Sequence, residues 1–204
     1  MTLFIIGLTI LVSLLAFNRR DIFDKLKFNA YFILHRKEWY RFMSYGLIHA
    51  DWGHLLINMF VLYSFGEIVE EFFIYYFEFK GYIYFIMLYL GGIGFSTLFD
   101  YGKYKNDIYY NAVGASGAVS AVVFASILLY PAGKIFLFFI PIGIPAPIFG
   151  ILYLVYSAYS AKKNTSNIGH SAHFWGAIFG LVFTIAINPK FVLLFANYLT
   201  GIFA

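Results

Sequence analysis

The stretch Gly114-Ala115-Ser116-Gly117 is the most informative part of this chain for both fold and chemistry. It is a turn of small residues at the start of an apolar segment, and a second polar turn, Ala172-His173-Phe174-Trp175-Gly176, opens another apolar segment further on. A serine and a histidine, each on the first turn of a different helix, are the two groups that a nucleophilic hydrolase requires. The sequence spacing alone does not show that the two side chains meet.

The composition indicates a membrane protein. The 204 residues are 62% apolar and 12% charged, with a mean hydropathy of +0.78, whereas a soluble domain is close to half apolar and a quarter charged. The length predicts one domain over residues 1–204. The chain contains no cysteine, which excludes disulfides and thiolate metal sites.

The hydropathy pattern predicts an all-α, polytopic bundle of six transmembrane helices. The first apolar segment is followed by Arg19 and Arg20 instead of a small-residue cleavage site, so we interpret it as a mature helix. The tail, residues 191–204, is short for a span and is predicted to lie at the membrane interface or to pack against the bundle. The six spans are expected at 2–17, 54–73, 81–99, 114–131, 146–161 and 171–188.

Two connecting segments have distinctive compositions. Residues 18–53 mix charged residues with Phe, Tyr and Trp, which predicts a long, structured first loop in the headgroup region. Prolines interrupt the apolar stretch between the fourth and fifth spans, which predicts a partly embedded loop. The net charge of +4 favours contact with anionic lipid. Nucleic acid is not an expected partner, because the basic residues lie in separate loops.

Alternating spans place the starts of the second, fourth and sixth spans on one side of the membrane. These starts carry His54 and Asn58, Ser116, and His173, respectively. Polar groups inside a bilayer are costly and face a cavity or a partner. We therefore expect the three spans to build one polar site.

The residue types around Ser116 suit acyl transfer. The first-turn amides of a helix lack intrahelical partners, so the amide of Ser116 is placed to hold an oxyanion. His54 and Asn58 are one helical turn apart and both can donate to the same oxygen. Small residues let a substrate backbone and the facing helix approach closely, and they are Gly114, Gly117, Gly176 and Gly180.

Each of these patterns also has a purely structural interpretation. A Gly-x-Ser-Gly sequence in an apolar helix most often serves helix packing. A single intramembrane histidine is as often structural as functional, and His54 with Asn58 would suit a bridge between helices. We interpret Ser120, one turn after Ser116, as a packing residue, and His170 as part of a loop.

The ordered set of motifs resembles the rhomboid family of intramembrane serine proteases. The resemblance begins with Glu38-Trp39-Tyr40-Arg41-Phe42 and His49, and continues with the His54-x-x-x-Asn58 helix and Gly66-Glu67-Ile68-Val69-Glu70. It ends with Gly114-Ala115-Ser116-Gly117-Ala118 and the run from His173 through Gly176 to Gly180. The order, the spacing and the six predicted helices fit over nearly the whole chain.

The resemblance implies a role for each matched residue. Ser116 would be the nucleophile and His173 the general base and then acid, with an acyl-enzyme intermediate. His54, Asn58 and the amide of Ser116 would form the oxyanion hole. The supporting residues would be Trp39, Arg41 and His49 in the first loop and Glu70 at the far end of the second span.

The resemblance also implies a membrane-protein substrate, cleaved within or next to its transmembrane helix, and no cofactor or metal. Some family members have an aromatic residue one turn after the serine, packed on the histidine; Ser120 occupies that place here. With the N-terminus cytoplasmic, as the family implies, the active site of this cell-membrane, multi-pass protein faces the extracytoplasmic side. Eleven of the fourteen basic residues then lie outside, which is the reverse of the positive-inside rule.

Other functions remain open at this stage. The main alternative is a catalytically inactive rhomboid-like protein that binds transmembrane helices, although such relatives usually lack the serine or the histidine. A metalloprotease is disfavoured because the chain has no His-Glu-x-x-His sequence. Haem binding by a histidine is not excluded by spacing. A transporter would place charges well inside a span. The sequence leaves the oligomeric state open.

Overall fold

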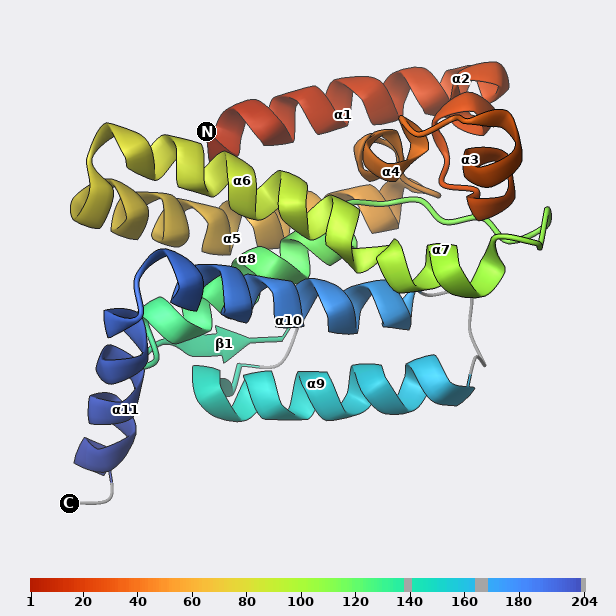
Figure 1. The fold of residues 1–204 in the computed structure, drawn as a ribbon. Coiled ribbons are helices and arrows are strands. Elements are labelled where there is room, and N and C mark those ends of the chain that lie inside the picture. The colour runs from red at the N-terminus through yellow and green to blue at the C-terminus, as the bar shows by residue number, and fades with distance from the viewer. Residues whose placement is uncertain (138–140, 164–168, 203–204) are drawn as a thin grey trace.

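The structure, a computed structural model, describes residues 1–137, 141–163 and 169–202. It is built of helices and one two-stranded hairpin (Figure 1). Helices occupy all six predicted ranges and the tail, and their ends differ from the predicted ends by a few residues. These helices are α1 (Thr2–Asn18), α5 (Trp52–Phe77), α6 (Phe79–Ser96), α8 (Ser116–Leu129), α9 (Ala146–Lys163), α10 (His170–Ile187) and α11 (Lys190–Ile202).

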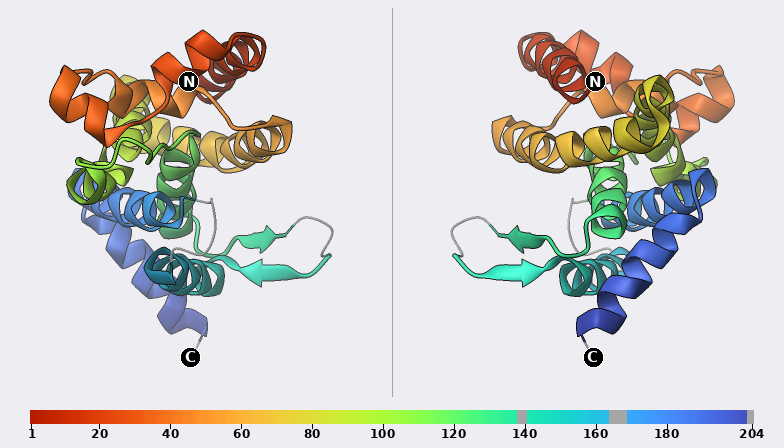
Figure 2. Two further views of the ribbon diagram at one scale, coloured as in Figure 1. Left: turned by 90° about the vertical axis from the view of Figure 1, so that its right-hand side faces the viewer. Right: turned by 90° about the vertical axis from the view of Figure 1, so that its left-hand side faces the viewer.

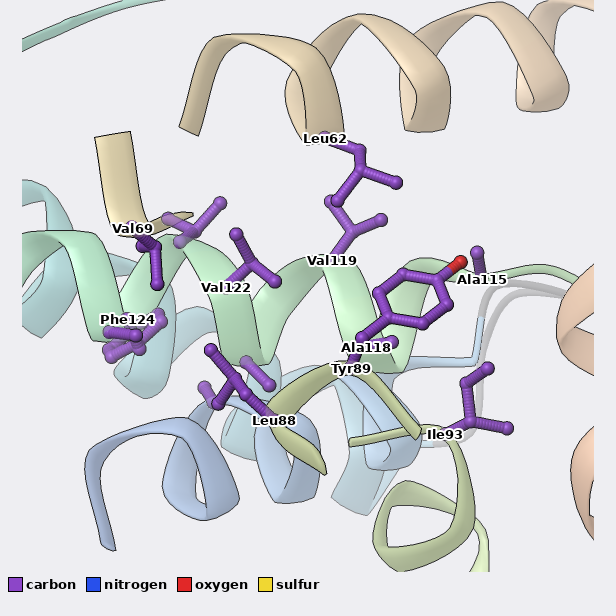
Figure 3. Close-up of a cluster of buried hydrophobic side chains, with 14 of the residues drawn as sticks. Leu62, Val69, Leu88, Tyr89, Ile93, Ala115, Ala118, Val119, Val122 and Phe124 are labelled. Carbon is purple, nitrogen blue, oxygen red and sulfur yellow. The ribbon is translucent and has the colours of Figure 1, made fainter. Parts of the chain in front are cut away.

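Helix α8 is the centre of the fold. Every residue from Gly117 to Leu129 is buried, as expected for a helix that is apolar on all sides. It packs against α5, α6 and α10, and Figure 3 shows Val119 and Val122 among side chains from the neighbouring helices, including Leu62 and Leu88. The residue that opens α8, Ser116, is therefore held at the start of a buried helix.

Small residues let α10 and α6 come close to α8. A β-carbon on Gly176 would collide with the carbonyl oxygen of Gly117, and one on Gly180 would collide with the carbonyl oxygen of Ala121. On the α6 side, a β-carbon on Gly92 would lie 2.9 Å from the α-carbon of Ala118. Backbones in direct contact gain dispersion energy that bulky side chains would prevent.

The segment between α1 and α5 is folded into four short helices: α2 (Arg20–Leu26), α3 (Ala30–Arg36), α4 (Arg41–Ser44) and the 3₁₀ helix η1 (Tyr45–Leu47). It is tied to the segment that precedes α8. The backbones of Phe28 and Ala112 exchange two hydrogen bonds, of 2.9 and 3.1 Å. Asn29, which caps α3, donates to the carbonyls of Ile108 and Tyr110.

Two features of the connections were not predicted. The stretch expected to be an embedded loop contains an antiparallel hairpin, β1 (Lys134–Phe136) and β2 (Gly143–Pro145), in which Ile135 pairs with Ile144. The hairpin projects from the bundle (Figure 2). A short helix, α7 (Leu98–Tyr104), follows α6 almost directly. Three-residue strands and a helix of about two turns are too short to produce a readable hydrophobic period.

The outer surface of the bundle is apolar. Helix α1 exposes Leu3, Phe4 and Leu11, and α9 exposes Ile151 and Val155. Among the described residues, two helical stretches are long and apolar enough to cross a bilayer, Phe79–Tyr104 and His170–Ile187. Helices α1 and α8 are apolar but shorter. Large exposed apolar surfaces of this kind mark contact with lipid or a partner, and the composition favours lipid.

Candidate functional site

Ser116 opens α8 directly after a glycine turn. The φ angle of Gly114 is +110°, a left-handed conformation that residues with a β-carbon rarely adopt. The N–H of Gly114 donates to the carbonyl of Tyr45 at 3.0 Å. A β-carbon on Gly114 would lie 2.5 Å from Cε1 of His54, so this glycine both turns the chain and makes room for the imidazole. The turn thereby places Ser116 beside His54.

His173 lies on the first turn of α10, where its N–H donates to the carbonyl of Gly169 at 3.0 Å. One turn later, Gly176 meets the backbone of α8 at Gly117, and this contact brings the two helix starts together. Ser116 and His173 line the same cavity, whose volume is about 1850 Å³. Within the described part of the chain, no hydrogen bond joins the Ser116 hydroxyl to the His173 imidazole. Such bonds often tighten only when substrate is bound.

His54 and Asn58 line the same cavity from the start of α5. Asp51 caps this helix by accepting a 2.8 Å hydrogen bond from the N–H of His54, which fixes the first turn. The side-chain amide of Asn58 donates to the carbonyl of His54 at 2.8 Å. An amide nitrogen carries two hydrogens, so this bond leaves the second for a ligand in the cavity.

His49 supports the serine turn from beneath and is fully buried. Its Nε2 accepts a 3.4 Å hydrogen bond from the N–H of Ala115, and its Nδ1 lies 3.0 Å from the hydroxyl of Ser13 on α1. Because Nε2 accepts, the ring proton resides on Nδ1. The Ser13 hydroxyl accepts this bond and donates its own hydrogen bond to the carbonyl of Leu47. Burial, with a smaller effect of His54, lowers the pKa of His49 to about 3, which keeps this ring neutral.

The remaining predicted support residues lie away from the cavity wall. Arg41, at the start of α4, is 5% exposed, and its guanidinium donates to Glu38 at 2.5 Å, in the turn after α3, and to the carbonyls of Asp24 and Lys27 at the end of α2. Trp39 is half exposed and stacks on Phe42. These residues shape the first loop; they do not touch the serine.

Glu70 lies at the other end of the bundle from the serine. Its carboxylate accepts from the N–H and the hydroxyl of Thr2, at 2.8 and 2.7 Å, and pairs with the terminal ammonium of Met1. Gly180, one turn beyond Gly176, continues the contact between α10 and α8 at Ala121. Glu70 and Gly180 therefore fix how α1 and α10 sit on the bundle.

Sequence reasoning missed an aromatic residue beside His173. The ring of Tyr153, in the middle of α9, stacks on the His173 imidazole with 6.3 Å between the ring centroids and 26° between their planes. Its hydroxyl lies 2.7 Å from the hydroxyl of Ser120. The one available indication was a tyrosine in the middle of an apolar span, because a buried phenol needs a polar partner. The sequence does not say which helix supplies that partner.

Comparison with known proteins agrees with the order of these motifs. The family described as "Rhomboid domain" matches residues 36–190, which include every predicted site residue. Two relatives come from Arabidopsis thaliana. "RHOMBOID-like protein 12, mitochondrial" is 32% identical over 145 residues, which is 63% of this chain and 40% of that protein. "Rhomboid-like protein 11, chloroplastic" is 33% identical over 91 residues, which is 45% of this chain and 29% of that protein.

The chain thus spans less than half the length of the curated relatives that it matches. The family match, by contrast, covers most of the chain itself. It extends from the first loop, through the serine turn at the start of α8, to the end of α10. With the starts of three of its helices lining one cavity, the chain is a membrane protein that belongs to the rhomboid family.

Proposed function

We propose that this protein is an intramembrane serine endopeptidase that cleaves transmembrane segments of other membrane proteins. The observation that carries the proposal is the meeting of three helix starts around one cavity: Ser116 on α8, His173 on α10 and His54 on α5. A nucleophile, a base and a donor from three separate helices are what acyl transfer requires. Helix packing by itself would not call for polar groups at this position.

The proposed reaction has two halves. In the first, the Ser116 hydroxyl attacks the carbonyl carbon of the scissile peptide, and its proton passes to His173. The oxyanion accepts hydrogen bonds from the Ser116 amide, Asn58 and His54. When the tetrahedral intermediate collapses, the C–N bond breaks and His173 returns the proton to the leaving amine. In the second half, water repeats these steps on the acyl-enzyme, and the acid is released with Ser116 restored.

The surroundings of the cavity support a membrane-embedded substrate. Helices α5, α8, α9 and α10 contribute to its walls together with α2, α7, β1 and residues between 107 and 114, and Ile57, Phe60 and Phe149 supply apolar surface. A transmembrane helix must unwind locally before its peptide bond is accessible, which is cheaper where helix-breaking residues occur. From the hydropathy and the resemblance to the rhomboid family, we further propose a six-span protein of the cell membrane whose cavity faces the extracytoplasmic side.

The proposal is tested with purified protein in detergent and a model single-span substrate. Wild type, Ser116→Ala and His173→Ala are compared, with circular dichroism and thermal unfolding to show that each variant is folded. We expect both variants to lose cleavage. Cleavage by Ser116→Ala would exclude Ser116 as the nucleophile.

A second function is favoured by one observation: in the described residues Ser116 and His173 are not hydrogen-bonded. On that reading the chain binds transmembrane helices without cutting them. Reaction of Ser116 with a fluorophosphonate distinguishes the two functions, because an inactive serine does not react. Labelling of wild type that disappears in His173→Ala supports the protease. Absence of labelling in wild type, with the model substrate still captured, supports the binding protein.

A further inference from the structure

Tyr153 is held in one position beside the His173 ring. Its own ring stacks on the imidazole and also packs against Phe124 on α8, at 5.6 Å, and Phe149 on α9, at 5.8 Å between centroids. All three separations lie in the range of favourable aromatic contacts. Tyr153 also lines the cavity that contains Ser116. The imidazole therefore has a fixed aromatic wall on one side.

The hydroxyl of Tyr153 is linked to the nucleophile's own backbone. The Ser120 hydroxyl donates its single hydrogen to the carbonyl of Ser116 at 2.8 Å. The 2.7 Å contact between the two hydroxyls must then be a bond in which Tyr153 donates and Ser120 accepts. A continuous chain thus runs from Tyr153 through Ser120 to the carbonyl of Ser116. It fixes the ring that contacts the base relative to the residue that carries the nucleophile.

His173 lacks the carboxylate that orients the base in many serine hydrolases. The ion pairs of the described residues do not involve His173. Its imidazole nevertheless has to face the Ser116 hydroxyl, because an error of about 1 Å in such a geometry costs about 100-fold in rate. Another group must therefore restrict the ring, and Tyr153 is in contact with it.

We propose that Tyr153 is the positioning residue for His173, and that Ser120 holds Tyr153 in place. The inference rests on the proposed protease function. The ring beside His173 is not supplied from the position of Ser120 on α8; the Ser120 hydroxyl is bonded to an aromatic residue supplied by a different helix, α9. The catalytic pair of α8 and α10 is thereby completed by a third helix.

The first experiment measures kcat and KM separately for cleavage of a model transmembrane substrate. Tyr153→Leu removes the ring, and we expect kcat to fall about 10- to 100-fold while KM changes little, because the ring orients the base. Tyr159→Leu is the matched control: it removes a tyrosine from the exposed face of the same helix, and both constants should stay at the wild-type values. A Tyr153→Leu protein with wild-type kcat, or with a change in KM alone, overturns the inference.

The second experiment does not depend on Tyr153→Leu being folded. Tyr153→Phe and Ser120→Ala each break the hydroxyl chain and keep the aromatic ring. We expect each to lower kcat by a similar, smaller factor, and the double variant to be no worse than either one, because the two residues act as one unit. If kcat of the double variant instead falls by the product of the two single reductions, Tyr153 and Ser120 act independently, and the role of Ser120 is overturned.

The same variants separate this inference from the proposed function. The rate of Ser116 labelling by a fluorophosphonate is measured beside cleavage. If labelling requires His173 but proceeds at the wild-type rate in Tyr153→Leu, the positioning role of Tyr153 is wrong and the protease function stands. If the wild-type protein is neither labelled nor able to cleave the substrate, both the protease function and the positioning role are wrong. Labelling that slows in Tyr153→Leu and not in Tyr159→Leu supports both.

Discussion

Gly176 on α10 faces the carbonyl oxygen of Gly117 on α8 so closely that no β-carbon fits between them. This contact decides how near the first turn of α10, with His173, comes to the first turn of α8, with Ser116. The separation of the backbones that carry Ser116 and His173, the proposed nucleophile and base, is thus set by direct backbone contact between the two helices.

Gly176→Ala should therefore reduce both stability and cleavage. The added methyl group forces α10 away from α8, and overpacking of this kind costs about 1–3 kcal/mol. Thermal unfolding and substrate cleavage in detergent measure the two effects. Gly102→Ala is the control, since a β-carbon on Gly102 meets nothing within 4 Å. A Gly176→Ala protein as stable and active as the control would show that α8 and α10 tolerate a wider separation.

Asn58→Ala should lower turnover more than substrate binding. Loss of one oxyanion donor costs roughly 10- to 1000-fold in kcat, with KM nearly unchanged. The substitution also removes a bond to the carbonyl of His54, four residues earlier. Ser64→Ala controls for that loss, because Ser64 makes the same kind of bond to Phe60 on the exposed side of the helix. Equal turnover in the two variants would remove Asn58 from the oxyanion hole.

Acidification should destabilise the protein through His49. Its pKa is lowered to about 3 in the folded state, from about 6.5 in the unfolded chain. Between these values the unfolded chain binds the proton and the folded protein does not, so stability is lost as the pH falls from about 6.5 towards 3. We expect the unfolding temperature of His49→Gln to depend less on pH than that of wild type.

His35→Gln is the matched control for this measurement, because His35 is exposed on α3. Unfolding temperatures are recorded between pH 7.5 and pH 4.5 for the three proteins. A His49→Gln curve parallel to that of wild type would assign the acid sensitivity to other groups.

Arg41→Lys should destabilise the first loop despite the retained charge. The guanidinium reaches Glu38 and two carbonyls at once, and an ammonium on a flexible stem does not reproduce that geometry. Each buried acceptor left without a donor costs about 1–3 kcal/mol. Arg20→Lys, at an exposed pair with Asp24, should change the unfolding free energy by less than about 0.5 kcal/mol. Similar effects of the two substitutions would contradict the linking role of Arg41.

The proposed orientation can be tested by thiol labelling, because the chain has no cysteine. Lys80 lies on the first turn of α6, Lys105 follows α7, and both are exposed. In intact cells, an impermeant thiol reagent should label Lys105→Cys and should reach Lys80→Cys only after lysis. The reverse pattern would place the cavity on the cytoplasmic side, as the distribution of basic residues predicts.

The sequence predicted the helices well, because long apolar segments with polar ends are read reliably from hydropathy. Family membership was also predicted correctly, from the order of short polar motifs. The hairpin at Lys134–Pro145 was missed because its strands are only three residues long. Tyr153 was missed for another reason: its contact with His173 joins α9 to α10, and no local pattern in the chain encodes which helices face each other.

The hydrogen bond between Ser13 and His49 has a consequence for the smallest unit that can be studied. The family match begins at residue 36 and leaves out α1, yet Ser13 on that helix is the partner of the His49 ring proton beneath the serine turn. A fragment trimmed to the matched segment would leave a buried imidazole without its acceptor. The first helix therefore supports the serine turn, and a protein truncated to residues 36–190 would lack that support.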